Sequence, residues 1–165
     1  MTEAVVYPDG RLVLGGLILR AALGRGGVRA DKQEGDGATP AGVLKLRRVL
    51  YRAGRVALPR AVVPREPIAP DDAWCDDPAH PDYNRMIRLP HPARHEVLWR
   101  DDGLYDIVGV LGWNDDPPVR GRGSAIFLHV AGSDLAPTAG CIALAVADLR
   151  AVLGAGLTEI LVLPA

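Results

Sequence analysis

Glycine and proline interrupt this chain so often that its helices and strands must be short. The 165 residues include 19 glycines and 14 prolines, and both residue types weaken or end regular structure when they fall inside it. The apolar stretches between these breaks are brief and typical of strands. The spacing of the breaks therefore predicts a mainly β domain.

Individual strands can be placed between the breaks. Residues 4–7 and 11–14 flank the turn Pro8-Asp9-Gly10, which predicts a hairpin. Other strands are expected at residues 17–23, 43–51, 96–99, 105–110, 125–130 and 158–163. Two loops separate them: residues 32–42 are polar and rich in glycine, and residues 59–92 are rich in proline and expected to be a long irregular excursion.

One segment has the periodicity of a helix. In residues 145–153, Val146, Leu149 and Val152 share one face, and Asp148 lies in the first turn. Glycines just beyond the segment can end the helix. The expected fold is mainly β with one main helix, in a single domain of residues 1–165 that is large enough to bury a core without disulfide bonds.

Charge and hydropathy exclude several classes of partner. The formal net charge is −1 at pH 7, so neither nucleic acid nor an anionic membrane surface is expected as the main partner. No run approaches the ~18 apolar residues of a membrane-spanning helix. The N-terminal residues lack the pattern of a signal peptide, so we expect a soluble chain that is not exported. The oligomeric state is left open.

A histidine and a cysteine stand out near the end of the chain. His129 ends an expected strand, and Cys141 follows Gly140, whose backbone can adopt a turn that a Cβ atom would forbid. We expect the helix after Cys141 to direct its N-terminus toward the sulfur and so to depress the pKa of the thiol. The backbone N–H groups of Gly140 and Cys141 are then candidates for an oxyanion hole.

Spacing alone leaves two readings of this pair. A free cysteine is most often a small buried apolar residue, and a histidine at the end of an apolar strand can be buried as well. Alternatively, a nucleophilic thiol needs a base within hydrogen-bond reach, and His129 is the only histidine in this half of the chain.

Several further blocks of sequence bear on this choice. They comprise residues 22–28 with 32–42 (KQEGDGATPAG), Trp74 with 83–85 (YNR), 112–115 (GWND), 123–129 (GSAIFLH) and 138–142 (TAGCI). In this order they resemble the L,D-transpeptidase catalytic domain, also called the YkuD family, over most of the chain. Ala139 and Ala143 stand where the commoner signature has a histidine and an arginine, so the resemblance is to the branch with a Thr-Ala-Gly-Cys motif.

This resemblance implies a mainly β fold of the YkuD β-sandwich type and a bacterial enzyme that acts on peptidoglycan stem peptides without a cofactor or a metal. Cys141 would be the nucleophile and His129 the base. The thiolate would attack the carbonyl after a diamino acid and release the terminal D-amino acid, and an amine would resolve the thioester. The residues implied for substrate binding are Tyr83, Asn84, Arg85, Trp113, Asn114, Ser124 and Thr138. Cell-wall chemistry would place the enzyme in the periplasm or facing the wall.

Other functions remain open at this point. With water as acceptor the chain would be an L,D-carboxypeptidase, and without reactivity it would be a binding module for wall peptides. Arg85, Arg120 and Arg122 are candidates to hold a substrate carboxylate. A zinc site formed by Cys75, His80, His91 and His95 is disfavoured because prolines flank His91, and a Cys75–Cys141 disulfide, which would abolish the nucleophile, is not favoured.

Overall fold

The computed structural model describes residues 2–165 and has short strands throughout, as the glycine and proline pattern predicts. The strands are β1 (Thr2–Val6), β2 (Arg11–Leu14), β3 (Leu17–Ala22), β4 (Val28–Arg29), β5 (Thr39–Pro40), β6 (Gly42–Tyr51), β7 (Arg65–Pro67), β8 (Asp72–Cys75), β9 (Met86–Arg88), β10 (His95–Val97), β11 (Ile107–Gly112), β12 (Phe127–Val130), β13 (Ile142–Leu144) and β14 (Leu157–Val162). The helices are the 3-10 turn η1 (Ser133–Leu135) and α1 (Val146–Gly154).

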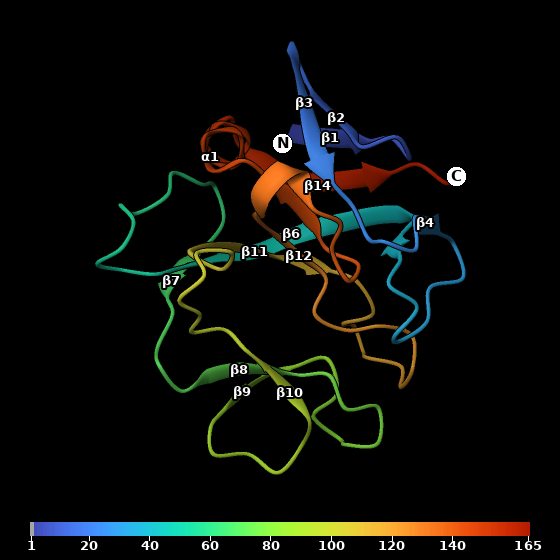
Figure 1. The fold of residues 1–165 in the computed structure, drawn as a ribbon, viewed down its shortest axis with the longest axis vertical. Coiled ribbons are helices and arrows are strands. Elements are labelled where there is room, and N and C mark those ends of the chain that lie inside the picture. Colours follow the sequence, from blue (N-terminus) through green and yellow to red (C-terminus); the bar gives the residue numbers. More distant parts are fainter. Residues whose placement is uncertain (1) are drawn as a thin grey trace.

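Hydrogen bonds close the main sheet into a ring. Its strand order is β11-β12-β13-β3-β2-β1-β14-β6-β7, and β11 also pairs with β6. The resulting barrel, in which β7 is an outer addition to β6, is visible in Figure 1. Most neighbours are antiparallel, whereas three pairs are parallel: β1 with β14, β12 with β13, and β6 with β7. Closing the ring satisfies backbone groups that an open sheet would leave unpaired at its edges.

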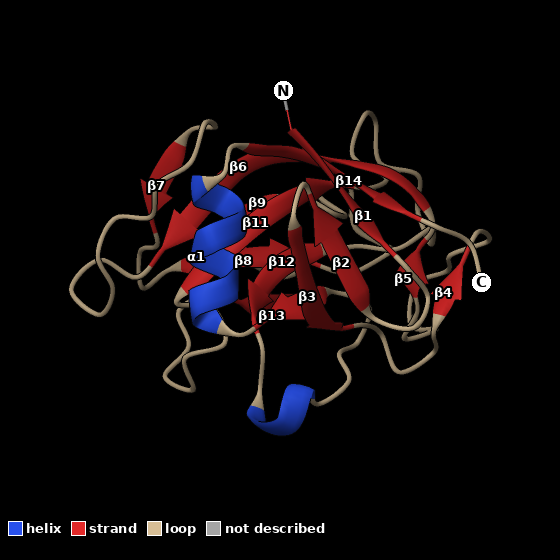
Figure 2. Ribbon diagram, turned by 90° about the horizontal axis from the view of Figure 1, so that it is seen from above, coloured by secondary structure: helices blue, strands red, loops and turns tan. Residues whose placement is uncertain are grey.

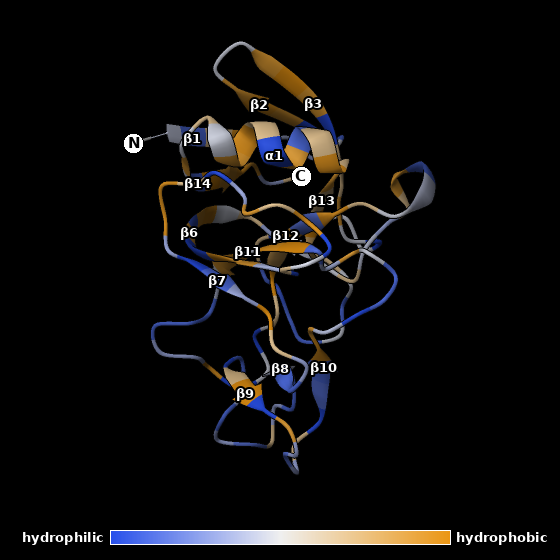
Figure 3. Ribbon diagram, turned by 90° about the vertical axis from the view of Figure 1, so that its left-hand side faces the viewer, coloured by the Kyte–Doolittle hydropathy of each residue, from blue (hydrophilic) through white to orange (hydrophobic). Residues whose placement is uncertain are grey.

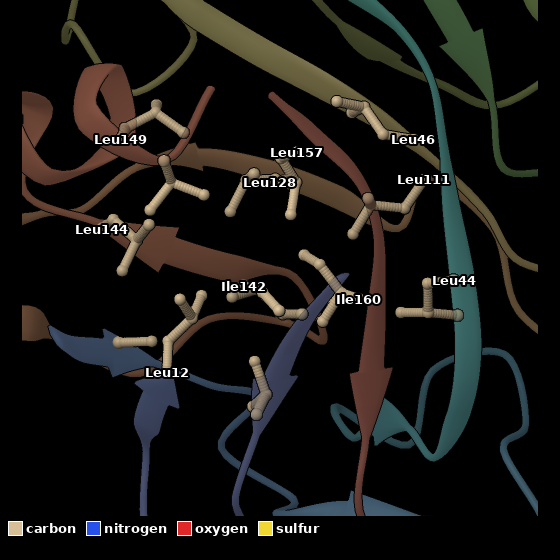
Figure 4. Close-up of a cluster of buried hydrophobic side chains, with 14 of the residues drawn as sticks. Leu12, Leu44, Leu46, Leu111, Leu128, Ile142, Leu144, Leu149, Leu157 and Ile160 are labelled. Carbon is tan, nitrogen blue, oxygen red and sulfur yellow. The ribbon is translucent and has the colours of Figure 1, made fainter. Parts of the chain in front are cut away.

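Alternating side chains fill the inside of this barrel. Leu44, Leu128, Ile142 and Ile160 have no exposed surface and belong to one apolar cluster. Figure 4 shows them pointing toward one another from neighbouring strands. Since successive side chains of a strand point to opposite faces, the neighbours of Leu128 on β12 face away from this cluster. Each fully buried leucine or isoleucine stabilises the fold by roughly 1.5–3 kcal/mol.

Helix α1 lies along one side of the barrel, beside β12 and β13 (Figure 2). Its buried residues are Leu149, Val152 and Leu153, which join the apolar cluster inside the barrel. The helix begins at Val146, with Asp148 in its first turn, and ends at Gly154. Expected and observed helix therefore agree to within one residue at each end.

A second small sheet lies apart from the barrel, at the bottom of Figure 1. Its strand order is β10-β8-β9, and we call residues 72–97 the cap. The cap has its own small apolar cluster of Ala73, Cys75, Ile87 and Ala93. Figure 3 shows that its ribbon is more hydrophilic than that of the barrel and α1. The cap is held mainly by polar contacts and by one face that packs on the barrel.

That shared face explains why β11 and β12 are buried on both sides. Val108 and Phe127 point out of the barrel and pack in one cluster with Trp74 and Leu98 of the cap region. His129 is two residues after Phe127 on the same strand, so it lies on this outer face as well. Cys141 belongs to the same cluster. The two residues singled out from the sequence therefore lie between barrel and cap.

The structure confirms the expectation of a mainly β fold with one α-helix, and it changes several of the expected elements. Strands β4 and β5 were not expected, and β5 lies within the predicted loop 32–42. The segment 59–92 is not irregular, because β7, β8 and β9 lie within it. Strand β13 was not expected, and it separates Cys141 from α1. Within residues 2–165, no helix has the length and apolarity needed to cross a membrane.

Candidate active site

A cavity of about 300 Å³ opens between the barrel and the cap. The barrel side contributes the nucleophile candidate and the base candidate, and the cap side contributes carboxylates. The lining residues are Glu34, Asp76, Glu96, Arg100, Leu104, Tyr105, Ser124, Ala125, His129, Gly132, Ala136, Pro137, Thr138, Ala139 and Cys141. Cys141 and His129 are buried, as expected for residues of a packed core, and both also border an accessible cavity, as expected for a nucleophile and its base.

The turn before Cys141 is built for a residue without a side chain. Gly140 has φ +139°, and a Cβ atom there would lie 2.8 Å from the carbonyl oxygen of Ala38. Thr138 fixes the same turn from inside. Its Oγ1 accepts a hydrogen bond from the Gly140 N–H at 3.1 Å and donates one to the Cys141 carbonyl at 2.7 Å. The turn therefore delivers Cys141 to the start of β13 in one defined orientation.

The Cys141 sulfur has two backbone partners. It accepts a hydrogen bond from the Phe127 N–H at 3.4 Å and donates one to the Ala125 carbonyl at 3.2 Å. Burial, followed by the negative charge of Glu96, raises the pKa of the Cys141 thiol to about 12. The expectation of a depressed pKa was wrong, because burial of the thiol and the charge of Glu96 outweigh the factors that lower the pKa. The thiol is neutral near pH 7.

His129 is held in one tautomer by its own strand. Its Nδ1 lies 2.8 Å from the Val130 carbonyl oxygen, and since a carbonyl can only accept, Nδ1 carries the proton and Nε2 has a free lone pair. Burial lowers the pKa of His129 below its usual 6.5. The residue is therefore a neutral imidazole that can accept a proton at Nε2. The carbonyl that orients it belongs to Val130, the next residue along the strand.

Sequence reasoning missed Tyr105 and Glu96. The Tyr105 ring stands edge-on to His129, with ring centroids 5.2 Å apart, and edge-on to Phe127 at 5.8 Å. Its hydroxyl donates a hydrogen bond to Glu96 Oε1. Glu96 lies on β10 of the cap, opposite Trp74 of β8. No local sequence signal marks either residue, because β10 and the segment before β11 meet only in three dimensions.

A second hydrogen-bonded group lies at another edge of the cavity. Glu34 Oε1 accepts hydrogen bonds from the Ser124 hydroxyl at 2.6 Å and from the Tyr83 hydroxyl at 2.7 Å. The Tyr83 oxygen also accepts a bond from the Gly123 N–H at 2.9 Å. Burial, followed by the hydrogen bond to Glu34, raises the pKa of Tyr83. Ser124 and Glu34 line the cavity, and Tyr83 supports them from behind.

Asn84 connects the cap to Cys141 through one peptide unit. Its Oδ1 accepts bonds from Trp74 Nε1 at 2.9 Å and from the Ala125 N–H at 3.1 Å, and its Nδ2 donates to the carbonyls of Trp113 and Asn114. The carbonyl of Ala125 in turn accepts the Cys141 thiol. Both Asn84 (φ +57°) and Ala125 (φ +53°) are in the left-handed region, which is costly for alanine.

The predicted substrate-binding residues fall into two groups. Ser124 and Thr138 line the cavity, as do the predicted catalytic residues Cys141 and His129. The other residues do not line it in the described part of the chain: Gly140, Tyr83, Asn84, Arg85, Trp113 and Asn114. The side chains of Trp113 and Asn114 bond to loop carbonyls, Trp113 Nε1 to Arg122 and Asn114 Nδ2 to Val119 and Gly123. Their substrate-binding role stays a prediction.

The arginines proposed to hold a substrate carboxylate are all on the outer surface. Arg85, Arg120 and Arg122 are exposed, and none of them borders the cavity within residues 2–165. The arginine that does border it is Arg100. Its guanidinium lies over the Tyr105 ring, 4.9 Å from the centroid, and its Nε donates to both Asp102 oxygens.

The glycine-rich loop at residues 32–42 is organised around a buried ion pair. Lys32, only 5% exposed, bonds to Asp36 Oδ1 at 2.5 Å. Asp36 also accepts the N–H groups of Gln33 and Ala38. The positive charge of Lys32 partly opposes the factors that raise the pKa of Cys141. This loop therefore supports the turn of Gly140, which packs on Ala38.

Two of the histidines considered for zinc lie together with an aspartate in the cap. His80, Asp82 and His91 bring potential ligand atoms within 4.8 Å of one another. However, Nδ1 of His80 accepts the Asp82 N–H and Nδ1 of His91 accepts the Ala93 N–H. Each neutral ring then carries its proton on Nε2, the nitrogen a metal would need. Cys75 and Cys141 are both free thiols.

These contacts define the chemistry available in the cavity. A neutral thiol and a neutral imidazole with a free Nε2 lone pair line the same cavity, which suits proton transfer at the moment of attack rather than a standing ion pair. A polar group with several carboxylates forms the opposite wall.

Comparisons with known proteins identify a family and several similar structures. A family model described as the L,D-transpeptidase catalytic domain (YkuD) matches residues 1–157. No curated protein matches the chain. Among solved structures, the chain is similar to L,D-transpeptidase 3 from Mycobacterium tuberculosis in complex with a faropenem-derived adduct (TM-score 0.48, 13% identity), covering 98% of this chain and 60% of that one. It is also similar to an L,D-transpeptidase from Mycobacterium smegmatis (TM-score 0.44, 14% identity), covering 98% and 58%.

Proposed function

Because the chain belongs to the YkuD family of L,D-transpeptidase catalytic domains, we propose that it is a cysteine acyltransferase acting on peptidoglycan stem peptides. Cys141 is the nucleophile and His129 the general base, and residues 1–165 act as one catalytic domain without a cofactor. The observation that carries the proposal is the shared cavity: the thiol of Cys141 and the oriented imidazole of His129 both line it.

The acylation step begins with a neutral pair. As the sulfur approaches the carbonyl carbon after the diamino acid of the donor, the thiol proton moves to His129 Nε2 and a C–S bond forms. The imidazolium then gives this proton to the nitrogen of the terminal D-amino acid. The C–N bond breaks, the D-amino acid leaves, and a thioester remains on Cys141.

The second step uses the same base in reverse order. An amine attacks the thioester carbon and loses a proton to His129 Nε2, so that an amide bond forms. The C–S bond breaks, and the imidazolium returns its proton to the leaving sulfur. The Val130 carbonyl keeps Nδ1 protonated throughout and stabilises the imidazolium formed in each step.

Developing negative charge on the donor carbonyl needs hydrogen-bond donors near Cys141. We assign this role to the backbone N–H of Cys141, at the turn that Gly140 permits. The Gly140 N–H is bonded to Thr138 Oγ1 at 3.1 Å, so it can contribute only if that bond loosens. The Phe127 N–H, which donates to the sulfur, supports the thiolate as it forms.

Mass spectrometry of the intact protein tests this proposal. After incubation with a stem tetrapeptide, we expect an adduct equal to the donor without its terminal D-amino acid, mapped to Cys141. Adding a D-amino acid should remove the adduct and yield the transfer product. Cys141→Ala should form no adduct, whereas Cys75→Ala, a matched change of the other free thiol, should form it normally.

Two results would redirect the proposal. An adduct that is released only to water, with no amine product, identifies an L,D-carboxypeptidase. A correctly folded protein whose Cys141 takes no acyl group from the peptide and is not labelled by a carbapenem is a binding module for wall peptides.

A further inference from the structure

The charge balance of the cavity is unusual for a site that binds a peptide. Three carboxylates, Glu34, Asp76 and Glu96, border it together with one guanidinium, Arg100. The guanidinium of Arg100 is paired with Asp102, to which its Nε and Nη2 donate hydrogen bonds. Its Nη1 lies 4.0 Å from Glu96 Oε1, too far for a hydrogen bond. Asp76 is paired with Arg94 at 3.1 Å. Within residues 2–165, Glu34 and Glu96 have no ion pair shorter than 4.0 Å, so these two carboxylates give the cavity an excess of negative charge.

Glu96 is the carboxylate most closely connected to the reacting groups. The Tyr105 hydroxyl fixes its Oε1, and the Tyr105 ring stands edge-on to His129 at 5.2 Å. Among the charged side chains around Cys141, Glu96 has the largest effect on the pKa of the thiol. Tyr105 thus links the position of Glu96 to the positions of both reacting groups.

Only one oxygen of Glu96 is used by the protein. Within residues 2–165, Tyr105 is its one hydrogen-bond donor, and that bond is made to Oε1. The Glu96 side chain remains 29% exposed and borders the cavity. Burial, together with the charges of Asp76 and Glu34, raises the pKa of Glu96. A bound cation would reduce this cost, because a buried charge is stable only when it is paired.

We propose that Glu96 is a specificity-determining residue whose free oxygen binds a primary ammonium group of the substrate beside Cys141. This inference rests on the proposed function, in which two primary amines take part: the side chain of the donor's diamino acid and the acyl acceptor. An acceptor bound as an ammonium gives one proton to water before it attacks the thioester, and His129 takes the second. A compact ammonium suits a single free carboxylate oxygen, whereas a guanidinium favours a carboxylate with both oxygens available. Neutralising Glu96 would also make the Cys141 thiol easier to deprotonate when the correct substrate is bound.

Two donor peptides and one variant distinguish the two amines. The donors are stem tetrapeptides with lysine or norleucine at the third position, and the variant is Glu96→Gln. If Glu96 binds the donor amine, kcat/KM for the lysine peptide should fall at least about 10-fold in Glu96→Gln, while the norleucine peptide changes little. If it binds the acceptor, donor consumption should stay constant and the ratio of amine product to hydrolysis product should fall about 10-fold. A 10-fold change corresponds to about 1.4 kcal/mol.

A matched control and an activity-independent readout complete the test. Glu66→Gln makes the same chemical change on β7, outside the cavity and exposed, and should leave all these ratios unchanged.

Cys141 alkylation by iodoacetamide needs no turnover. The amide of Nα-acetyl-lysine should change the rate of this alkylation in the wild type, with saturation at high concentration, but not in Glu96→Gln. The norleucine analogue should leave the alkylation rate of both proteins unchanged.

The outcomes separate the two proposals. If no peptide is turned over but the lysine amide acts on alkylation through Glu96, the proposed function fails and the ammonium site stands. If both donors and both products change equally in Glu96→Gln, or if nothing changes, the ammonium site is wrong. Should Glu96→Gln not fold, Tyr105→Phe, which frees Glu96 without removing its charge, is expected to weaken the preference for the lysine peptide over norleucine.

Discussion

The barrel and the cap meet at one cavity, but they are stabilised in different ways. Inside the barrel, fully buried side chains such as Leu44, Leu128 and Ile160 form one continuous cluster. The cap has only a small cluster of its own, and it is joined to the barrel by apolar packing of Trp74 and by the hydrogen bonds of Asn84. The barrel contributes Cys141 and His129, and the cap contributes Asp76 and Glu96. The proposed reacting groups on the barrel and the carboxylates on the cap can therefore be altered separately.

The largest effect is expected from removing the base on the barrel. His129→Gln should reduce the rate of acyl transfer by about 10²–10⁴-fold, because a positioned general base contributes this much. Folding should be retained, since glutamine can also occupy a buried polar position beside the Val130 carbonyl. Steady-state kinetics with a stem tetrapeptide measures the loss. His91→Gln, in the cap, serves as the matched control, and an equal loss there would contradict a special role for His129.

Truncating apolar side chains compares the two parts directly. Leu128→Ala should lower the free energy of unfolding by about 3–4 kcal/mol, because it leaves a cavity inside the closed barrel. Ile87→Ala in the cap, where fewer apolar neighbours surround the side chain, should cost about 2 kcal/mol. Urea denaturation followed by circular dichroism gives both values. The contrast between barrel and cap disappears if Ile87→Ala is as costly as Leu128→Ala.

The connection between the two parts can be weakened at Asn84. Asn84→Ala removes four hydrogen bonds and leaves buried partners such as Trp74 Nε1 unpaired, so it should cost about 2–3 kcal/mol. Because the Ala125 carbonyl accepts the Cys141 thiol, acyl transfer should slow as well.

A paired variant separates side chain from backbone at this position. Asn84→Gly loses the same hydrogen bonds but tolerates φ +57°, so it should be about 1 kcal/mol more stable than Asn84→Ala. If the two variants are equally stable, the left-handed backbone at Asn84 contributes nothing measurable.

The smallest expected effect is the pH dependence of stability. Burial lowers the pKa of His129 in the folded protein below 6.5, so on acidification the unfolded chain binds a proton first. The contribution of this group is fully present above pH 6.5 and is lost as the pH falls through the folded pKa. Urea denaturation at pH 8 and pH 5 should therefore show a larger loss for the wild type than for His129→Gln. A loss of the same size in both proteins would assign the acid sensitivity to other groups.

The barrel was also easier to predict from the sequence than the cap. Short apolar runs mark β1, β2, β6 and β14, and the spacing of Leu149 and Val152 marks α1. Strands β8 and β9 escaped prediction because prolines and aspartates surround them, and because Trp74 and Ile87 are buried by tertiary contacts rather than by an alternating pattern. Strand β13 has only three residues, too few for any periodicity.

The same difference holds for the candidate site. Cys141, His129, Ser124 and Thr138 lie in collinear motifs, and all of them border the cavity. Glu96 and Tyr105 carry no local signal, since their contact depends on how the cap folds back over β11 and β12. The pKa of Cys141 was expected in the wrong direction for a related reason: the burial of the thiol and the approach of Glu96, which raise the pKa, arise only when the cap folds over the barrel.

The pairing of β1 with β14 has a consequence for how the chain reaches this structure. Strand β14 lies between β1 and β6 and bonds to both, so the ring cannot close until residues 157–162 have left the ribosome. Contacts this distant in sequence are slow to form. Until then, β1 and β6 each present an unpaired edge that could join a neighbouring chain. Chaperone dependence during synthesis should therefore concentrate on the period before the last strand emerges.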